Sequence, residues 1–161
     1  MTDENYIDIA IEISKNAKYP YGAIVVKGNK IIGRSDDKTL METSMYSHAE
    51  LEAIESASKN KNLYGDLKGA TMYVSCEPCM MCMGAIVNSR IKKIYIGALD
   101  PKTGSCKSVI NMENYKFNHI VEVETGILQE DCEYILKDFF KMLRKMKRRK
   151  KWSKIAFLRK E

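Results

Sequence analysis

Long apolar runs are absent from this sequence, in which no stretch approaches the ~20 residues that a membrane span needs. Internal repeats, low-complexity segments and linkers that would indicate a second domain are absent as well. The chain has 161 residues, of which 45% are hydrophobic and 30% charged, as in globular proteins that bury a sizeable core. We therefore expect one globular domain and no membrane association.

The N-terminal segment MTDENY is acidic and lacks the basic and then apolar layout of a signal peptide. The cysteines do not suit a disulfide framework either, because there are five and three of them, Cys76, Cys79 and Cys82, are clustered. Free thiols are typical of a reducing cytosol. We expect a cytoplasmic protein in which Cys106 and Cys132 are ordinary thiols.

Acidic residues are nearly missing from the C-terminal end of the chain. Residues 141–161 hold 11 of the 27 lysines and arginines and only one acid, Glu161, so this segment carries +10. The other 140 residues hold 16 basic and 20 acidic side chains, a net charge of −4. The overall charge of +6 therefore belongs to one segment, for which we expect a polyanionic partner, nucleic acid before membrane.

The residues that can carry chemistry lie in two short motifs, SHAELEAI and CEPCMMC. His48, Cys79 and Cys82 offer one imidazole and two thiolates, a set that suits tetrahedral zinc. Three protein ligands leave one position open, as in a catalytic zinc site that carries a water. Glu50 stands two residues after His48, where it can move that water's proton without being a ligand. The pattern H-x-E followed by P-C-x-x-C, which includes Pro78, is similar to the signature of the zinc nucleobase deaminases.

Three other interpretations of the cysteines stay open at this point. Cys76 completes C-x-x-C-x-x-C with Cys79 and Cys82, so a closed structural zinc site with His48 is one of them. The run also resembles ferredoxin spacing, although the further Cys-Pro of that pattern is missing. Ordinary buried thiols are the third. Catalytic zinc is favoured because Cys79 and Cys82, at i and i+3, share one helix face, whereas Cys76 belongs to the preceding strand.

Hydrophobic periodicity predicts the elements around these motifs. Tyr19-Pro20 is expected to end the first helix, because a residue before proline avoids helical geometry. Gly28-Asn29 lies between two β-branched runs and predicts a hairpin turn, and Ser35 to Tyr46 is expected to be a loop. The expected helices are residues 4–18, about 47 onward, 79–89 and 129 to beyond 150; the expected strands are a hairpin within 21–35, then 70–75, 93–97 and 120–125.

Strands that alternate with helices predict an α/β fold, a three-layer α/β/α sandwich around a five-stranded mixed sheet. Ser47 is the expected N-cap of the helix that follows it, with Glu50 three residues on as a capping-box partner. That capping role is the structural alternative to a catalytic Glu50. Both halves of the zinc motif start helices, and the positive ends of the helix dipoles help to hold ligand thiolates.

A broader resemblance covers about residues 4–147, through the segments YPYGAIVV, GAIVNSRIKKIYIGALDPKTG, FNHIVEVETGIL and DCEYILKDFFKMLRK. The chain resembles the cytidine deaminase superfamily and, within it, the bacterial tRNA adenosine deaminases. The last two segments are the more telling, because other branches of the superfamily are not similar there. The resemblance implies a cytidine deaminase-like fold, one zinc per chain, a cytosolic homodimer, and conversion of adenosine to inosine at the wobble position of a tRNA anticodon.

The same resemblance assigns roles to individual residues. His48, Cys79 and Cys82 match the family's zinc ligands, and Glu50 matches its proton shuttle. Contacts to the substrate base are implied at four further positions: Ala23, Ala49, Glu77 and Pro78.

The chain departs from the family beside the site. The family usually has an Asn in the loop after the hairpin, where this chain has Asp37, and Pro-Thr-Ala before its His-Ala-Glu, where this chain has Met45, Tyr46 and Ser47. An amide donates and accepts hydrogen bonds, whereas an ionised carboxylate only accepts them. Asp37 is therefore predicted to bind substrate by accepting from a ribose hydroxyl or an amino group. The alternative is a solvated turn formed with Asp36.

We expect a zinc-dependent hydrolytic deaminase. Glu50 takes a proton from the activated water, the hydroxide attacks the amidine carbon, and Glu50 passes protons to the ring nitrogen and the departing amine. The preferred substrate is a splayed adenosine in a tRNA anticodon loop. A deaminase of a small free base, nucleoside or nucleotide, of the guanine or cytosine type, is the second hypothesis. A non-catalytic protein that binds zinc and RNA is the third.

The basic segment divides the chain into an expected deaminase domain, residues 1–147, and a basic tail, residues 148–161. We expect residues 144–160 to form an arm that grips RNA phosphates; a frayed, solvated end is the alternative. The tail also carries apolar residues that can dock on the body, on a partner subunit or on exposed bases: Trp152, Ile155, Phe157 and Leu158. The cations expected to contact RNA are Arg144, Lys145, Lys147, Arg148 and Arg149.

Overall fold

The computed structural model describes residues 1–60 and 65–158, with side chains as far as residue 149. Five strands form one sheet in the order β2-β1-β3-β4-β5. The helices are α1 (Asp3–Lys15), α2 (Ala49–Ser58), α3 (Met80–Asn88) and α4 (Gln129–Leu158), with a short 3₁₀ turn, η2, at Met112–Asn114. The strands are β1 (Gly22–Lys27), β2 (Lys30–Asp36), β3 (Thr71–Cys76), β4 (Lys93–Ala98) and β5 (Glu122–Thr125).

The sheet is mixed, as the sequence predicted. β1 pairs antiparallel with β2 and β3, whereas β3, β4 and β5 run parallel. Gly28 and Asn29 both have positive φ, at 57° and 59°, which is the geometry of the tight hairpin turn expected there. The start of β1 and the ends of β2 and β3 consequently meet at one edge of the sheet, where the candidate site lies.

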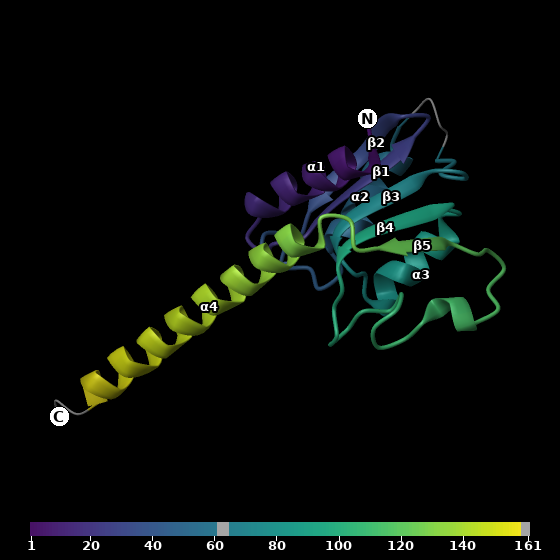
Figure 1. Cartoon of the computed structure of the whole chain (residues 1–161). Helices are drawn as coiled ribbons and strands as arrows, with labels where there is room; N and C mark the ends of the chain where they lie inside the picture. The colour runs from purple at the N-terminus through teal and green to yellow at the C-terminus, as the bar shows by residue number, and fades with distance from the viewer. Residues whose placement is uncertain (61–64, 159–161) are drawn as a thin grey trace.

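Side chains alternate between the two faces of the sheet, and each face has its own apolar cluster. In β1, Val25 packs with α2 and α3, and Ile24 packs with α1 and the start of α4. Figure 1 shows the resulting layers, with α1 and α4 on one side of the sheet and α2 and α3 on the other. The three-layer α/β/α sandwich is therefore confirmed.

Close packing of α2 on the sheet depends on Gly33. A Cβ atom at this position of β2 would lie 2.3 Å from the carbonyl oxygen of Ala53, far inside van der Waals contact. A larger residue would push α2 away from β2. Because α2 begins beside His48, Gly33 also helps to set the position of the candidate site.

The predicted boundaries differ from the structure by up to three residues, and two of these differences have a clear cause. Helix α1 ends at Lys15 and not near Lys18, because Asn16 caps it with its backbone N–H and donates its side-chain amide to the Glu12 carbonyl at 2.9 Å. The segment expected to be a loop from Ser35 begins two residues later, at Asp37, because β2 continues to Asp36 through its pairing with Gly22.

Helix α4 continues past residue 150, as predicted, and its outer half projects from the body (Figure 1). Its inner half packs on β4 and α1, with Ile135 and Leu136 against the cluster around Tyr6 and Ile7. The helix is unbroken at residue 147, so the predicted domain boundary falls inside one element. Side chains from residue 150 onward, including Trp152, Ile155, Phe157 and Leu158, lie outside the described residues, as do residues 159–161. Within the described chain, no helix combines the length and apolar character needed to cross a membrane.

Candidate metal centre and substrate pocket

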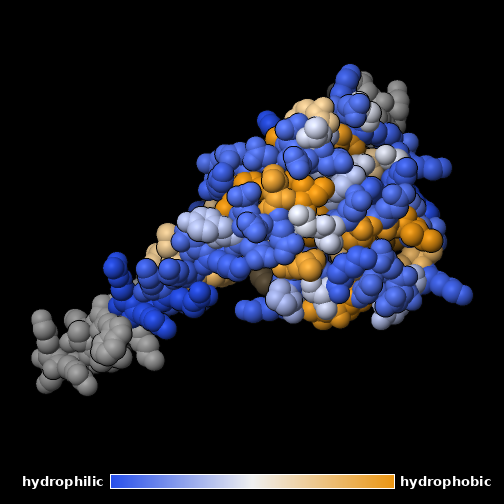
Figure 2. Space-filling model, in the orientation of Figure 1, coloured by the Kyte–Doolittle hydropathy of each residue, from blue (hydrophilic) through white to orange (hydrophobic). Residues whose placement is uncertain are grey.

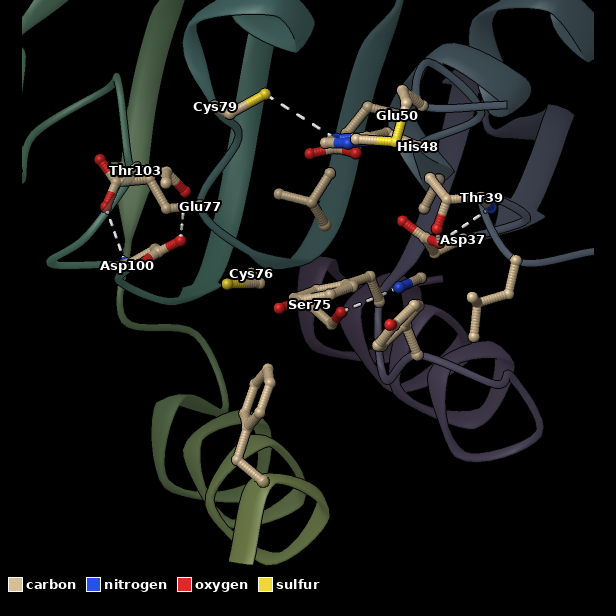
Figure 3. A pocket seen from close by; sticks show the side chains of 18 residues that line it. Asp37, Thr39, His48, Glu50, Ser75, Cys76, Glu77, Cys79, Asp100 and Thr103 are labelled. Atoms are coloured by element: carbon tan, nitrogen blue, oxygen red, sulfur yellow. Dashed lines mark hydrogen bonds between the residues drawn. The ribbon is translucent and has the colours of Figure 1, made fainter. Parts of the chain in front are cut away.

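The two zinc half-motifs converge where α2 and α3 begin. His48 is the N-cap of α2 and Cys79 is the N-cap of α3, both with extended backbone, and Cys82 follows in the first turn of α3. Neither cap residue bonds its own helix with its side chain, because the side chains point toward each other (Figure 3). The prediction that Ser47 caps α2 was wrong: its hydroxyl donates to Glu42 Oε2 at 3.1 Å. With Ser47 displaced from the cap, the capping-box explanation of Glu50 no longer applies.

The spacing of the ligand atoms fits a tetrahedral ion. His48 Nδ1 lies 3.5 Å from Cys82 Sγ and 3.8 Å from Cys79 Sγ, and all three ligand atoms lie within 4.8 Å of one another. Ligands at normal Zn–N and Zn–S lengths would be about 3.6 Å apart in a tetrahedral site. Among the described residues, this is the one such group of His, Cys, Asp and Glu side chains, and Cys76 is not part of it. The donor set therefore fits zinc with three protein ligands.

The protonation of the two cysteines also suits a cation. Hydrogen bonds from Cys82 and His48 lower the pKa of Cys79 to about 4, whereas the pKa of Cys82 is raised because it donates to Cys79 and is buried. The thiolate is the form in which a cysteine binds a metal ion. A divalent ion would replace the shared proton at the centre of the group.

Glu50 lies in the first turn of α2 with only 8% of its surface exposed. Burial raises the pKa of its carboxyl to about 7, against the opposing effects of its own backbone N–H and of His48. A general acid–base group works best when its pKa is close to the working pH. Glu50 thus has the position and the proton affinity of a group that transfers protons beside the metal centre.

A cavity of about 460 Å³ opens beside the metal centre, a volume in the range of small-molecule sites (Figure 3). It is lined by Tyr19, Tyr21, Gly22, Asp37, Thr39, Leu40, Met45, His48, Ala49, Glu50, Val74, Ser75, Cys76, Glu77, Cys79, Asp100, Thr103 and Phe140. The charged groups in this set are acidic, and none of the lining residues is a lysine or arginine. The cavity therefore favours a neutral group, and a phosphate is better placed outside it.

One wall of the cavity is a loop that Glu77 holds in place. The two oxygens of its carboxylate accept backbone N–H groups of Asp100, Cys106, Lys107 and Ser108 at 2.7–3.0 Å, and the Ser108 hydroxyl as well. These hydrogen bonds outweigh burial and lower the pKa of Glu77.

The loop also passes very close to the metal motif. Gly104 pairs with Cys79 in an isolated β-bridge, and a Cβ at Gly104 would lie 2.2 Å from Glu77 Oε2. The Glu77 carboxylate, Gly104 and the candidate ligand Cys79 consequently lie in direct contact.

The structure brings some of the predicted substrate contacts together and not others. Asp37, Ala49 and Glu77 line the cavity beside Glu50. Ala23 and Pro78 do not line it, because both are fully buried in the fold, Ala23 in the cluster under α2 and α3. Gly22, one residue before Ala23, lines the cavity instead.

Sequence reasoning missed several lining residues, of which Tyr21, Ser75 and Phe140 are the clearest. The sequence predicts only that Tyr21 and Ser75 fall within strand segments and that Phe140 falls within the last helix. The antiparallel pairing of β1 with β3 places Tyr21 and Ser75 at the same edge of the sheet. Tyr21 and Ser75 are brought together by the pairing of β1 with β3, which local sequence patterns do not reveal.

The predicted RNA contacts, Arg144, Lys145, Lys147, Arg148 and Arg149, are all exposed on the projecting half of α4. Up to residue 149, none of them forms an ion pair with another described residue. Figure 2 shows that the described part of this projection is hydrophilic on the visible face.

An α/β/α sandwich with a His–Cys–Cys centre, a buried glutamate and an adjoining cavity defines a nucleobase deaminase of the zinc-dependent kind. Sequence comparison agrees with this class. The profile of the MafB19-like deaminases matches residues 5–144, so the chain belongs to that family and is a hydrolytic deaminase.

Named relatives cover nearly the whole chain. A tRNA-specific adenosine deaminase of Bacillus subtilis (strain 168) is 40% identical over 151 residues, which are 91% of this chain and 93% of that protein. The tRNA-specific adenosine deaminase of Haemophilus influenzae is 38% identical over 152 residues, 91% of this chain and 87% of that protein.

Solved structures give the same result for the fold. A structure from studies of A-to-I editing by tRNA:A34 deaminases superposes with a TM-score of 0.76 at 31% identity, covering 82% of this chain and 99% of that one. A guanine deaminase of Nitrosomonas europaea superposes with a TM-score of 0.71 at 19% identity, covering 86% of this chain and 84% of that one. The second likeness concerns the fold alone.

Proposed function

We propose that this protein is a zinc-dependent deaminase that converts adenosine to inosine at the wobble position of a tRNA anticodon, in the cytoplasm. The observation that carries the proposal is the convergence of His48, Cys79 and Cys82 beside buried Glu50, on a cavity of about 460 Å³. The tRNA-specific relatives at 38–40% identity support the choice of substrate.

The chain's residues would divide the reaction between binding and proton transfer. His48, Cys79 and Cys82 would hold zinc, which supplies a water whose pKa is lowered toward ~7 from about 15.7. Glu50 takes the proton of this water and delivers protons to the ring nitrogen N1 and to the leaving amine. A C6–O bond forms, the C6–N bond breaks, and ammonia leaves, so that adenosine and water give inosine and ammonia.

The cavity accepts one nucleoside and not a stacked duplex. An RNA substrate must therefore present the reacting base splayed out of a loop. Phosphates stay outside, since the lining has no cation to pair with them. Tyr19 and Phe140 line the cavity and are joined through Phe139, with ring centroids 5.7 Å and 5.2 Å apart, which gives flanking bases an aromatic surface.

The outer half of α4 is the proposed arm for the RNA backbone. Its exposed cations follow Phe140 on the same helix, so they extend from the cavity toward solvent. Lysine and arginine that neutralise phosphates release counter-ions, which makes such binding strongly dependent on salt. In this proposal, residues 1–147 form the deaminase domain that carries out the reaction, and the basic tail, residues 148–161, contributes to RNA binding.

A homodimer is proposed from the apolar surface beside the site. Leu40, Met41, Met45 and Tyr46 are each more than half exposed, and Met80, next to Cys79, is 58% exposed. Such exposed apolar clusters mark interaction surfaces. Leu40 and Met45 also line the cavity, so a second copy on this surface would shield its rim.

A deaminase of small bases or nucleosides is the second candidate, because the nucleoside-sized cavity has no lysine or arginine in its lining and does not itself require RNA. The test is to incubate the protein with a tRNA pool and, separately, with a panel of free bases and nucleosides, and to measure ammonia and inosine. We expect inosine in tRNA and little ammonia from the panel. Ammonia from guanine or cytosine, without inosine in tRNA, would contradict the proposed substrate.

A further inference from the structure

The hydrogen-bonding groups that face the cavity are mostly acceptors or are already occupied. Asp37 and Asp100 are carboxylates, and each uses an oxygen to hold a nearby threonine: Thr39 Oγ donates to Asp37 and Thr103 Oγ donates to Asp100, both at 2.6 Å. Ser75 Oγ accepts the Gly22 N–H at 3.0 Å and could still donate its own proton, but Ser75 is only 3% exposed and is a less accessible donor than the half-buried Tyr21. A ligand that needs a donor therefore has few side chains to choose from.

Adenine needs such a donor. When C6 and N1 face Glu50 for the reaction, the ring nitrogens that remain are N3 and N7, and both are acceptors. An ionised carboxylate cannot donate to them. A ring nitrogen left without a partner in a buried site costs affinity, since its hydration is lost on binding.

Tyr21 is the lining residue that meets this need. Its hydroxyl has no hydrogen-bond partner among the described residues, while its ring packs on the core cluster under α2 and α3. Its backbone is held on both sides: its N–H donates to the Tyr19 carbonyl at 2.8 Å, and its carbonyl accepts the Asp37 N–H at 3.2 Å. The position of the ring is therefore fixed before any ligand enters.

The surroundings of Tyr21 keep its hydroxyl a donor. Burial, and after it the electrostatic effect of the acidic groups nearby, raises the pKa of Tyr21 above its usual value. The phenol consequently keeps its proton at any working pH. It is a neutral donor among carboxylates.

On the basis of the proposed function, we propose that Tyr21 is a specificity-determining residue whose hydroxyl donates a hydrogen bond to N3 or N7 of the bound purine. It is not needed for proton transfer, which belongs to Glu50. It aligns the purine so that C6 faces the metal centre. Tyr21 directly precedes β1, and its carbonyl accepts the N–H of Asp37, the residue that follows β2.

The test pairs one enzyme change with single-atom changes in the substrate. RNA stem-loops would carry adenosine, 3-deazaadenosine or 7-deazaadenosine at the wobble position, so that one ring nitrogen at a time becomes C–H. Wild type and Tyr21→Phe would be compared by kcat/KM for deamination. Phenylalanine keeps the packed ring and removes only the hydroxyl. Tyr19→Phe is the matched control, since Tyr19 also lines the cavity.

We expect Tyr21→Phe to lose roughly tenfold in kcat/KM on adenosine, the upper range for one neutral hydrogen bond. On one of the two deaza substrates it should lose nothing further, because the partner atom is already gone. Tyr19→Phe should change all three substrates by the same factor. Zinc content and Tm of both variants should equal those of wild type.

Two results would overturn the role of Tyr21. One is an equal loss by Tyr21→Phe on all three substrates. The other needs no variant: a wild-type enzyme indifferent to both deaza substitutions has no donor at either nitrogen. A wild-type enzyme inactive on the adenosine stem-loop would instead contradict the proposed function, and the assignment of Tyr21 with it.

Discussion

Glu77, at the metal-site edge of the sheet, accepts four backbone N–H groups and a hydroxyl, whereas Arg148, on the outer half of α4, has no counter-ion among the described residues. The first region fixes its side chains before substrate arrives. The second presents positive charge without a defined partner. Chemistry requires the former, since small displacements of reacting groups are costly, and binding a phosphate backbone requires only the latter. Substitutions should therefore act steeply in one region and gradually in the other.

The steepest effect is expected from Glu50→Gln. The substitution keeps shape and removes proton transfer, so zinc should stay bound while kcat falls by at least the ~10²–10⁴-fold typical of one acid–base group. Glu52→Gln is the matched control from the same helix turn, where Glu52 only approaches Lys38 at 3.9 Å. Single-turnover rates and zinc content would be measured for both variants. If Glu50→Gln kept most of its kcat, the assigned role would be wrong.

Cys79→Ser should also abolish turnover, here by loss of the metal. One ligand fewer removes zinc, and the starts of α2 and α3 lose their connection, so Tm should fall as well. Cys76→Ser should keep zinc, because Cys76 lies outside the ligand group. Metal analysis and thermal unfolding of the two variants distinguish a site with three protein ligands from a closed site in which Cys76 is the fourth ligand. Zinc lost from Cys76→Ser would support the closed site.

Glu77→Gln tests whether the fixed region depends on its buried carboxylate. A neutral amide weakens several charge-assisted hydrogen bonds at once, and we expect a loss of about 1.5–3 kcal/mol in the free energy of unfolding. Gly104→Ala should act in the same direction, because its Cβ would meet Glu77 Oε2 at 2.2 Å. Gly84→Ala, in α3, is a control for the loss of a glycine in general, because its Cβ would meet nothing within 4 Å and its φ is not positive. Urea unfolding gives the comparison, and equal stability of Glu77→Gln and wild type would dismiss the role of the carboxylate.

Deletion of residues 144–161 should produce the gradual response of the other region. RNA affinity should fall, and the slope of log K against log salt should flatten by about 0.7–0.9 for each phosphate that the shortened chain no longer neutralises. Zinc content and turnover of a small nucleoside should not change. Lys137→Gln, which removes a cation of α4 paired with Glu133, is the control and should leave the slope unaltered. An unchanged affinity and slope after deletion would rule out the arm.

The smallest effect is expected from Asp37→Asn. Asp37 lies in the cavity wall, but the substitution keeps its size and shape. Asp37 is buried, yet one oxygen already holds Thr39, so the change should alter relative kcat/KM among nucleosides by a few-fold and leave Tm nearly constant. Asp36→Asn, one residue away in β2, is the control. An identical order of preference in all three proteins would leave Asp37 as a turn residue only.

The sheet, and the grouping of the candidate metal ligands, could be predicted from the sequence because both follow from local patterns. The spacing of His48, Glu50, Cys79 and Cys82 reflects the first turns of two helices, and strands β1 to β5 follow from alternating apolar residues. Ser47 failed as a cap for a physical reason: His48 must occupy the extended N-cap position to face the cysteines.

The cavity wall was harder to foresee, because its residues come together only through tertiary contacts. Backbone groups near Glu77 were expected to align the base, but no role was predicted for its carboxylate, which accepts backbone N–H groups up to 31 residues away in sequence. Tyr21 looked like a strand residue until the pairing of β1 with β2 and β3 placed it beside Asp37. Such long-range proximity is not encoded in any local window.

The unbroken helix α4 has a consequence for how the molecule can change over time. Phe140 in the cavity wall and Arg149 on the arm are nine residues apart on one helix, about 13–14 Å along its axis. Each residue turns the helix by about 100°, so a single residue inserted between Phe140 and Arg144 would swing every later cation to a different side. No charge would be lost, yet the arm would point elsewhere. Seven inserted residues would nearly restore the direction. The direction of the arm therefore depends on the number of residues between Phe140 and Arg144 more than on the identity of any single lysine.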